Sequence, residues 1–193
     1  MSMSNTLETR NRRSGTRAKT TNYPLDVMNK DPLMEYVDED DKVIGCFPRS
    51  EIRRRKENYR IIAVFVFNDK GQLLVQKRSA ELKRFPNCYD SSVGGHVEPG
   101  ESYEEAALRE MKEELGIIEP LELIKKKKIT YEGVTKFVSL FKCFTIQKLK
   151  INEHEVKEVK FLGISQIKAM IKKGKVFLPV FREFFKDLYG DFK

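Results

Sequence analysis

The sequence predicts a single α+β domain, an α/β/α sandwich around a mixed β-sheet, over residues 25–193. Two observations lead to this class. Apolar, β-branched runs that are typical of strands alternate irregularly with segments whose apolar residues recur at helical spacing. Several strand-like runs are separated only by short polar turns, which indicates hairpins between them.

Residues 1–24 are expected to form a basic tail outside this domain. They are rich in Ser, Thr, Asn and Arg, and Glu8 is their only acid. Such a segment cannot bury enough apolar surface to order itself, and it has no apolar core of the kind that a secretory signal requires. A targeting segment, a nucleic-acid contact and an inert tail all remain open for it.

The first part of the domain is predicted to contain hairpins and one short helix. Residues 35–45 indicate two short strands joined by an acidic turn, and Asp38 to Asp41 are expected to be solvated there. Residues 49–56 predict a short basic helix. Residues 61–67 form an unbroken apolar run, typical of a buried strand, and residues 72–78 are expected to return beside it as a hairpin.

The part after residue 120 predicts a second long hairpin from residues 121–131 and 134–147. The four lysines at 125–128 lie in its first strand. A solvated edge strand is favoured over a nucleic-acid groove, because lysines on edge strands also prevent aggregation.

The C-terminal part predicts one strand and two helices. Residues 156–162 indicate the strand, and Ser165 is expected to cap a helix over residues 165–172. Pro179 stands where a last helix would begin. The apolar stripe of that helix is expected to pack in the core, and it consists of Val180, Phe181, Phe184, Phe185 and Leu188.

The composition is that of an ordinary globular protein with an excess of positive charge. The net charge of +8 favours anionic partners, of which a phosphorylated small molecule is preferred over nucleic acid. No apolar stretch approaches the length of a membrane span. Cys46, Cys88 and Cys143 show no paired spacing, which indicates reduced thiols and a cytoplasmic location. A homodimer is compatible with these features and is not determined by them.

The most informative stretch is residues 95–117, GHVEPGESYEEAALREMKEELGI. It predicts a helix with Ser102 as N-cap, Glu105 completing a capping box, and Gly116 just beyond its end. The residues on its predicted apolar face are Ala107, Leu108, Met111 and Leu115.

Three carboxylates share another face of this helix. Glu110, Glu113 and Glu114 stand at positions i, i+3 and i+4, a spacing at which like charges destabilise an isolated helix. A solvated acidic face is the structural alternative. A hard divalent cation such as Mg²⁺ or Mn²⁺ prefers oxygen ligands, and a metal site beside the glycine turn is favoured mainly by the motif described next.

The spacing of this stretch resembles the Nudix box, Gly-x5-Glu-x7-Arg-Glu-U-x-Glu-Glu-x-Gly-U, in which U is apolar. Every required position matches; they are Gly95, Glu101, Arg109, Glu110, Met111, Glu113, Glu114, Gly116 and Ile117. The resemblance to the Nudix hydrolases implies a metal-dependent hydrolase that cleaves a nucleoside diphosphate linked to another moiety X.

The resemblance also implies roles for single residues. Glu110, Glu113 and Glu114 would be metal ligands or the general base, with the carbonyl of Gly94 as a further ligand. Glu101 and Arg109 would brace the loop and the helix through an ion pair. Some relatives add a late acidic ligand, for which Glu155 is preferred over Glu153.

Residues for the substrate are expected shortly before the box. Lys77, Arg78 and Arg84 are candidate phosphate-binding cations, with a solubilising surface as the alternative. Tyr89 is a candidate for stacking on a base or ring, although an aromatic residue there more often packs in the core.

Over residues 34–190 the chain is also similar to the branch of the family related to isopentenyl-diphosphate isomerase. The segments that carry this similarity are EYVDEDDKVIG, PRSEIRR and VQKRS. That isomerase has a catalytic cysteine where this chain has Gly94, and a histidine where it has Tyr59 or Arg60. Its REUxEE segment is degraded, whereas the one here is intact, which favours hydrolysis over isomerisation. A catalytically silent Nudix domain that binds a nucleotide or RNA is the third hypothesis.

Overall fold

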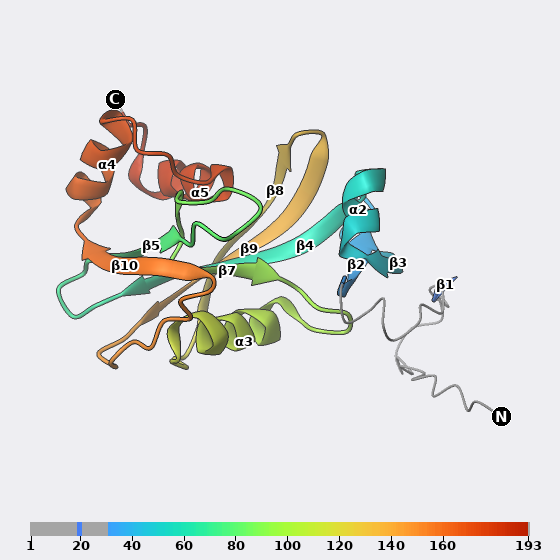
Figure 1. Cartoon of the computed structure of the whole chain (residues 1–193), viewed down its shortest axis with the longest axis horizontal. Helices are drawn as coiled ribbons and strands as arrows, with labels where there is room; N and C mark the ends of the chain where they lie inside the picture. Colours follow the sequence, from blue (N-terminus) through green and yellow to red (C-terminus); the bar gives the residue numbers. More distant parts are fainter. Residues whose placement is uncertain (1–18, 21–30, 193) are drawn as a thin grey trace.

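The computed structural model describes residues 19–20 and 31–192, and Figure 1 shows their arrangement. Within these residues ten strands form one mixed sheet. The strands are β1 (Lys19–Thr20), β2 (Leu33–Val37), β3 (Val43–Pro48), β4 (Asn58–Phe67), β5 (Leu73–Arg78), β6 (Tyr89–Asp90), β7 (Val93–His96), β8 (Glu122–Tyr131), β9 (Val134–Phe144) and β10 (Val156–Leu162). The helices are α2 (Arg49–Arg55), α3 (Tyr103–Leu115), α4 (Ile164–Lys172) and α5 (Pro179–Tyr189).

The predicted α/β/α sandwich is confirmed. Helix α3 covers one face of the sheet, and α4 and α5 cover the other (Figure 1). Strand β4 contributes to the core on both sides of the sheet, because its alternate residues face opposite layers. Ile62, Val64 and Val66 pack in the core under α3. Ala63 and Phe65 pack in the core under α4 and α5.

Strands β4 and β5 are joined by the expected turn, but the expected pairing along the two strands is wrong. The two strands pair only at Phe67 and Leu73, because Ser92 lies between them. The buried Ser92 hydroxyl accepts a hydrogen bond from the Val66 N–H at 2.8 Å and donates one to the Leu74 carbonyl at 2.6 Å. Strand β4 therefore pairs with β7 and with β9, while β5 pairs with β10 and β6.

The second long hairpin, β8 with β9, is confirmed, and β8 is an edge strand. Its four lysines form ion pairs with carboxylates of neighbouring elements. Lys127, for example, lies 2.8 Å from Glu183 of α5, and Lys125 lies 2.6 Å from Asp187 of the same helix. The lysine run thus holds the edge strand against other elements.

Two further expectations are wrong in part, and a third concerns residues that lie mostly outside the described part of the chain. Gly163, and not Ser165, is the N-cap of α4, since the Gln166 side chain accepts the Gly163 N–H at 2.8 Å. Leu188 is 40% exposed, whereas the phenylalanines of α5 are buried. The tail expectation for residues 1–24 lies outside the described residues, apart from β1, which pairs in parallel with β3.

The acidic turn between β2 and β3 is not uniformly solvated. The side chain of Asp41 is only 9% exposed, because it accepts hydrogen bonds from Arg60 and from the Tyr103 hydroxyl, at 2.7 and 3.0 Å, and pairs with Lys126. Asp40 on the same turn stays exposed. The turn is therefore attached to β4, α3 and β8.

Candidate active site

Helix α3 begins and ends where its caps are expected. The Ser102 hydroxyl accepts the Glu105 N–H at 3.2 Å, and the Glu105 carboxylate accepts the Ser102 N–H at 2.8 Å. Gly116 follows the helix in the left-handed conformation, with φ of 69°. These caps fix where α3 begins and ends, and with that the positions of Glu110, Glu113 and Glu114 along it.

Gly95 of β7 allows α3 to approach the sheet closely. A Cβ atom added at Gly95 would overlap the carboxyl group of Glu110. Only glycine leaves that volume free. The glycine of the box therefore determines where a carboxylate of the box stands.

Arg109 connects the loop and the helix, as the sequence predicts. Its guanidinium donates two hydrogen bonds to the carboxylate of Glu101, at 2.8 and 3.0 Å. It also donates to Glu110 at 3.0 Å, to Glu113 at 3.2 Å, and to the backbone carbonyl of His96 at 2.9 Å. Bidentate, charge-assisted bonds of this kind fix orientation as well as distance.

The glutamates of α3 differ in their environments. Glu113 is about half exposed, whereas Glu114 is 3% exposed and accepts a hydrogen bond from the Gln76 amide at 3.3 Å. Burial and then the charges of Glu110 and Glu155 raise the pKa of Glu114 well above its ordinary value. Burial likewise raises the pKa of Glu110 to about 7, against the opposing effect of Arg109.

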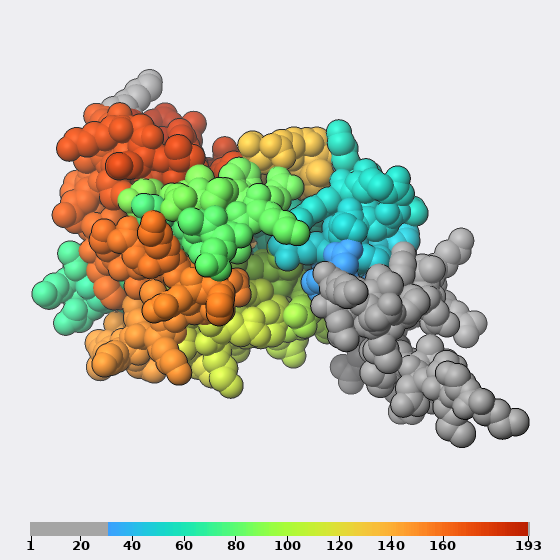
Figure 2. All heavy atoms as spheres, in the orientation of Figure 1, coloured from blue at the N-terminus to red at the C-terminus, as the bar shows by residue number. Residues whose placement is uncertain are grey.

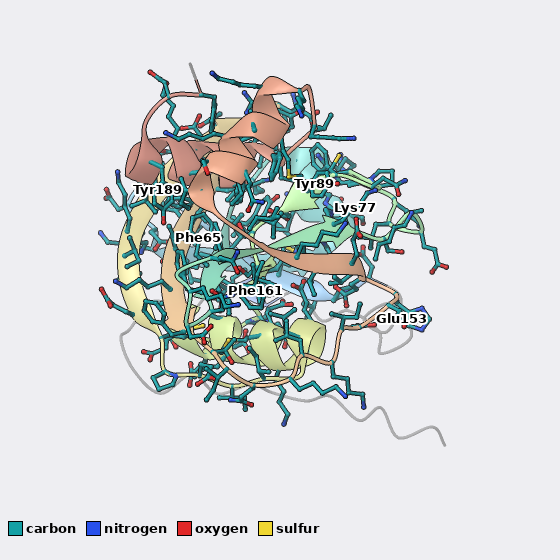
Figure 3. All side chains as sticks on the ribbon, turned by 90° about the vertical axis from the view of Figure 1, so that its left-hand side faces the viewer. Phe65, Lys77, Tyr89, Glu153, Phe161 and Tyr189 are labelled. Atoms are coloured by element: carbon teal, nitrogen blue, oxygen red, sulfur yellow. The ribbon has the colours of Figure 1, made fainter. Side chains whose placement is uncertain are left out.

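Glu155, from the loop before β10, lines the same cleft as these glutamates, and Glu153 does not. Figure 3 shows Glu153 on an outer loop, where it is exposed. Asp90 lies 3.9 Å from Arg78 and is buried, and burial raises its pKa to about 6. A Cβ at Gly94 would lie 3.8 Å from the Asp90 carboxylate.

This donor set fits a divalent cation. All its side chains offer oxygen, and the charge of Glu155 contributes to the raised pKa values of Glu110 and Glu114. Within residues 31–192, no three His, Cys, Asp or Glu side chains stand at the spacing of a closed metal cage. Mg²⁺ does not require such a cage, since it is usually held by one or two carboxylates, waters and substrate phosphates.

The carboxylates form one end of a cleft of about 380 Å³. In Figure 2, α2 in cyan, the loop before β7 in green and α3 in yellow-green surround this recess. Arg78 and Arg84 line it, as predicted for substrate-binding residues. Lys77 and Tyr89 do not line it. Tyr89 stacks on Phe177 at 5.1 Å between ring centroids and lies beside Lys77 (Figure 3).

Three basic residues of the cleft were missed as site residues, namely Arg49 and Arg53 of α2 and Lys136 of β9. The signal for the first two was present, because the four-residue spacing places them on one side of the predicted basic helix. Lys136 had no local signal. It reaches the cleft because β9 pairs in parallel with β4, which sets Lys136 beside Tyr59.

Comparison with known proteins agrees with this fold. Residues 57–182 match the family described as the NUDIX domain. An uncharacterized Nudix hydrolase of Nostoc sp. is 34% identical over 149 residues, which cover 74% of this chain and 87% of the relative. A crystal structure of the protein DR0079 from Deinococcus radiodurans is similar with a TM-score of 0.73 and 27% identity, over 81% of this chain and 99% of that chain.

The chain therefore belongs to the Nudix hydrolases, a family of pyrophosphohydrolases. A further relative is the isopentenyl-diphosphate Delta-isomerase 2 of Photorhabdus laumondii, 30% identical over 153 residues, which cover 75% of this chain and 84% of the relative. None of the helices within residues 31–192 has the length and apolarity that crossing a membrane requires.

Proposed function

We propose that this protein is a divalent-metal-dependent hydrolase that cleaves the diphosphate linkage of a nucleoside-diphosphate-type substrate by attack of water on phosphorus. The observation that carries the proposal is the polarity of the cleft. Carboxylates of α3 and Glu155 line it together with Arg78 and Arg84, which are paired with Asp90 and Glu132. The carboxylates outnumber Arg109, which pairs with Glu110 and Glu113, so a bound cation would balance the excess negative charge and attract the phosphates of a substrate.

The residues of the site would have different roles. Glu110, Glu114 and Glu155, with the carbonyl of Gly94, would hold Mg²⁺ or Mn²⁺, which when bound neutralises phosphate oxygens and lowers the pKa of a coordinated water. One of Glu110, Glu113 and Glu114 would take the proton of the attacking water. Arg109 and Glu101 would keep these carboxylates in place.

The test is a panel of diphosphates incubated with Mg²⁺ or Mn²⁺, with phosphate-bearing products as the readout. Glu114→Gln should lower the rate by about 10²- to 10⁴-fold, as expected for loss of a catalytic carboxylate. The metal-free variant should melt at a higher temperature than wild type, because glutamine removes a buried charge. Its activity loss would then not be due to unfolding.

Glu104→Gln is the matched control, because Glu104 lies on α3 in an exposed position and does not line the cleft. Its activity should equal that of the wild type. A panel on which the wild-type protein releases no product, or a Glu114→Gln variant as active as wild type, would refute the hydrolase proposal.

Isomerisation of an isoprenoid diphosphate is the second candidate, and the 30% identity to an isomerase favours it. The residue at a decisive position opposes it. Gly94 stands where that isomerase has its cysteine, and Cys88 does not line the cleft. Incubation of isopentenyl diphosphate in deuterated water separates the two, since isomerisation incorporates deuterium and hydrolysis does not. We expect no incorporation.

A further inference from the structure

Three basic residues line the cleft near Tyr59. Arg49 and Arg53 extend from α2, and Lys136 extends from β9; all three are partly buried. Within residues 31–192, none of them has a carboxylate oxygen within 4.0 Å, although most other arginines of this part of the chain form such pairs. Carboxylates of the described residues therefore act on these cations only from beyond ion-pair distance.

The cluster is electrostatically unfavourable as it stands. Burial, followed by the neighbouring Arg53, lowers the pKa of Arg49. Burial, followed by Arg84, lowers the pKa of Lys136. Like charges brought together out of water cost free energy unless an opposite charge joins them. The arrangement therefore favours the binding of an anion between these side chains.

Hydrogen-bonding capacity is also left over at the same place. The buried Nε atoms of Arg49 and Arg78 have no hydrogen-bond partner within the described residues, and both residues line the cleft. Buried polar groups in folded proteins are almost always paired. Unpaired donors that share one cleft are what a bound oxyanion would satisfy.

The cluster belongs to the same cleft as the carboxylates. Arg49 lies close enough to Glu110 to be influenced by its charge. His96 lines the same cleft and stacks on Tyr59 at 5.7 Å between ring centroids. A single elongated ligand in this cleft can therefore contact both the carboxylates and the cations.

We propose that Arg49, Arg53 and Lys136 bind a terminal phosphate, so that the substrate is a diphosphate or triphosphate with one unsubstituted end. This inference rests on the proposed hydrolase function. A terminal phosphate carries a charge of about −1.5 to −2 at neutral pH and three acceptor oxygens. A phosphate substituted on both sides has fewer free oxygens and a smaller charge. The charge of three unpaired cations therefore suits a terminal phosphate better than a phosphate substituted on both sides.

The proposal separates two substrate classes. Nucleoside diphosphates, nucleoside triphosphates and other monosubstituted diphosphates have the required end. Nucleoside diphosphate sugars and dinucleotides lack it. Arg49 and Arg53 precede residue 57, where the match to the family begins, whereas Lys136 lies within it, so two of the three cations come from outside the matched domain.

The experiment measures binding without metal or turnover. Inorganic pyrophosphate, and diphosphate methylated at both ends, are titrated calorimetrically in EDTA. Pyrophosphate should bind at least about tenfold more tightly, because charge-assisted hydrogen bonds contribute more than the free energy of a tenfold change. Arg53→Gln and Lys136→Gln should each weaken pyrophosphate binding about tenfold or more and leave the weak binding of the methylated compound unchanged.

Arg54→Gln is the matched control, since Arg54 is the next residue of α2 but is 70% exposed and paired with Glu51. Its binding should equal that of wild type. Equal affinity for the two diphosphates, or equal effects of Arg53→Gln and Arg54→Gln, would overturn the proposal. Lys136→Gln, on a different element, provides the same test if Arg53→Gln does not fold.

Kinetics then connect the site with turnover. Arg53→Gln should lower kcat/KM for a nucleoside diphosphate about tenfold or more and change it little for the corresponding nucleoside diphosphate sugar. Failure of the hydrolase proposal is distinguishable, since wild type would then bind pyrophosphate selectively but hydrolyse nothing. Turnover without selective binding would refute the terminal-phosphate site alone.

Discussion

Gly95 shows how a residue without a side chain can position a functional group. Its missing Cβ leaves the volume that the Glu110 carboxyl occupies, and Glu110 in turn accepts a hydrogen bond from Arg109. The requirement for glycine at this position is steric, and it arises from one contact between β7 and α3.

We predict that Gly95→Ala lowers hydrolytic activity by at least about 100-fold, because the displaced Glu110 cannot keep a geometry to which catalysis is sensitive at the ångström level. Gly71→Ala is not a suitable control, since Gly71 has a positive φ. Gly94→Ala is more informative, because a Cβ there meets nothing nearer than 3.8 Å. The rates of both variants, measured beside their circular dichroism spectra, check this. A Gly95→Ala protein with the activity of Gly94→Ala would contradict it.

Among the secondary structure elements, the hairpin of β2 and β3 supports the site without lining its acidic end. Glu35 of β2 accepts the Gly100 N–H of the box loop at 3.2 Å. Asp41 in the turn accepts hydrogen bonds from Arg60 of β4 and Tyr103 of α3. The hairpin thus holds the loop and the first turn of α3 from outside the catalytic helix.

We predict that Asp41→Asn lowers the free energy of unfolding by about 1–3 kcal/mol, because it leaves the Arg60 guanidinium with a weaker partner in a half-buried place. Asparagine tolerates the positive φ of 64° at this position, so backbone strain does not add to the loss. Asp40→Asn, on the exposed side of the same turn, should change stability by less than about 0.5 kcal/mol. Urea denaturation measures both. Equal effects of the two substitutions would show that the turn is not attached through Asp41.

For the molecule as a whole, the acidic end of the cleft reduces stability in the absence of metal. The pKa of Glu110 is raised to about 7 by burial. Above its ordinary pKa an unfolded Glu110 has released a proton that the folded chain still binds. The stabilisation from this group is therefore complete at low pH and is lost as the pH rises through about 7.

We predict that, in EDTA, Glu110→Gln gains stability relative to wild type by about 2 kcal/mol between about pH 5 and about pH 8. His96 titrates in the opposite sense, since its pKa is lowered, but both proteins contain it and its effect cancels in the difference. Urea denaturation at the two pH values provides the measurement. A difference that does not depend on pH would show that Glu110 has an ordinary pKa.

Much of the fold follows from patterns that are local in the chain. Ser102, Glu105 and Gly116 mark the ends of α3 because caps act within a few residues of the helix terminus. Pro179 marks the start of α5 for the same reason. The mistakes have distant causes. Ser92 separates β4 from β5 by bonding to both strands, and Asp41 is enclosed by partners from three other elements.

The same division applies to the site. The sequence by itself determined the family and the helix that carries Glu110, Glu113 and Glu114, because spacing along one helix specifies them. The ion pair of Arg109 with Glu101 was implied by the resemblance to the family, and the structure contains it. Only the tertiary structure decided that Glu114 is buried, that Lys77 and Tyr89 lie outside the cleft, and that Lys136 lies in it beside the cations of α2. Strand pairing brings together residues far apart in the chain, and their proximity therefore has no signature in local sequence.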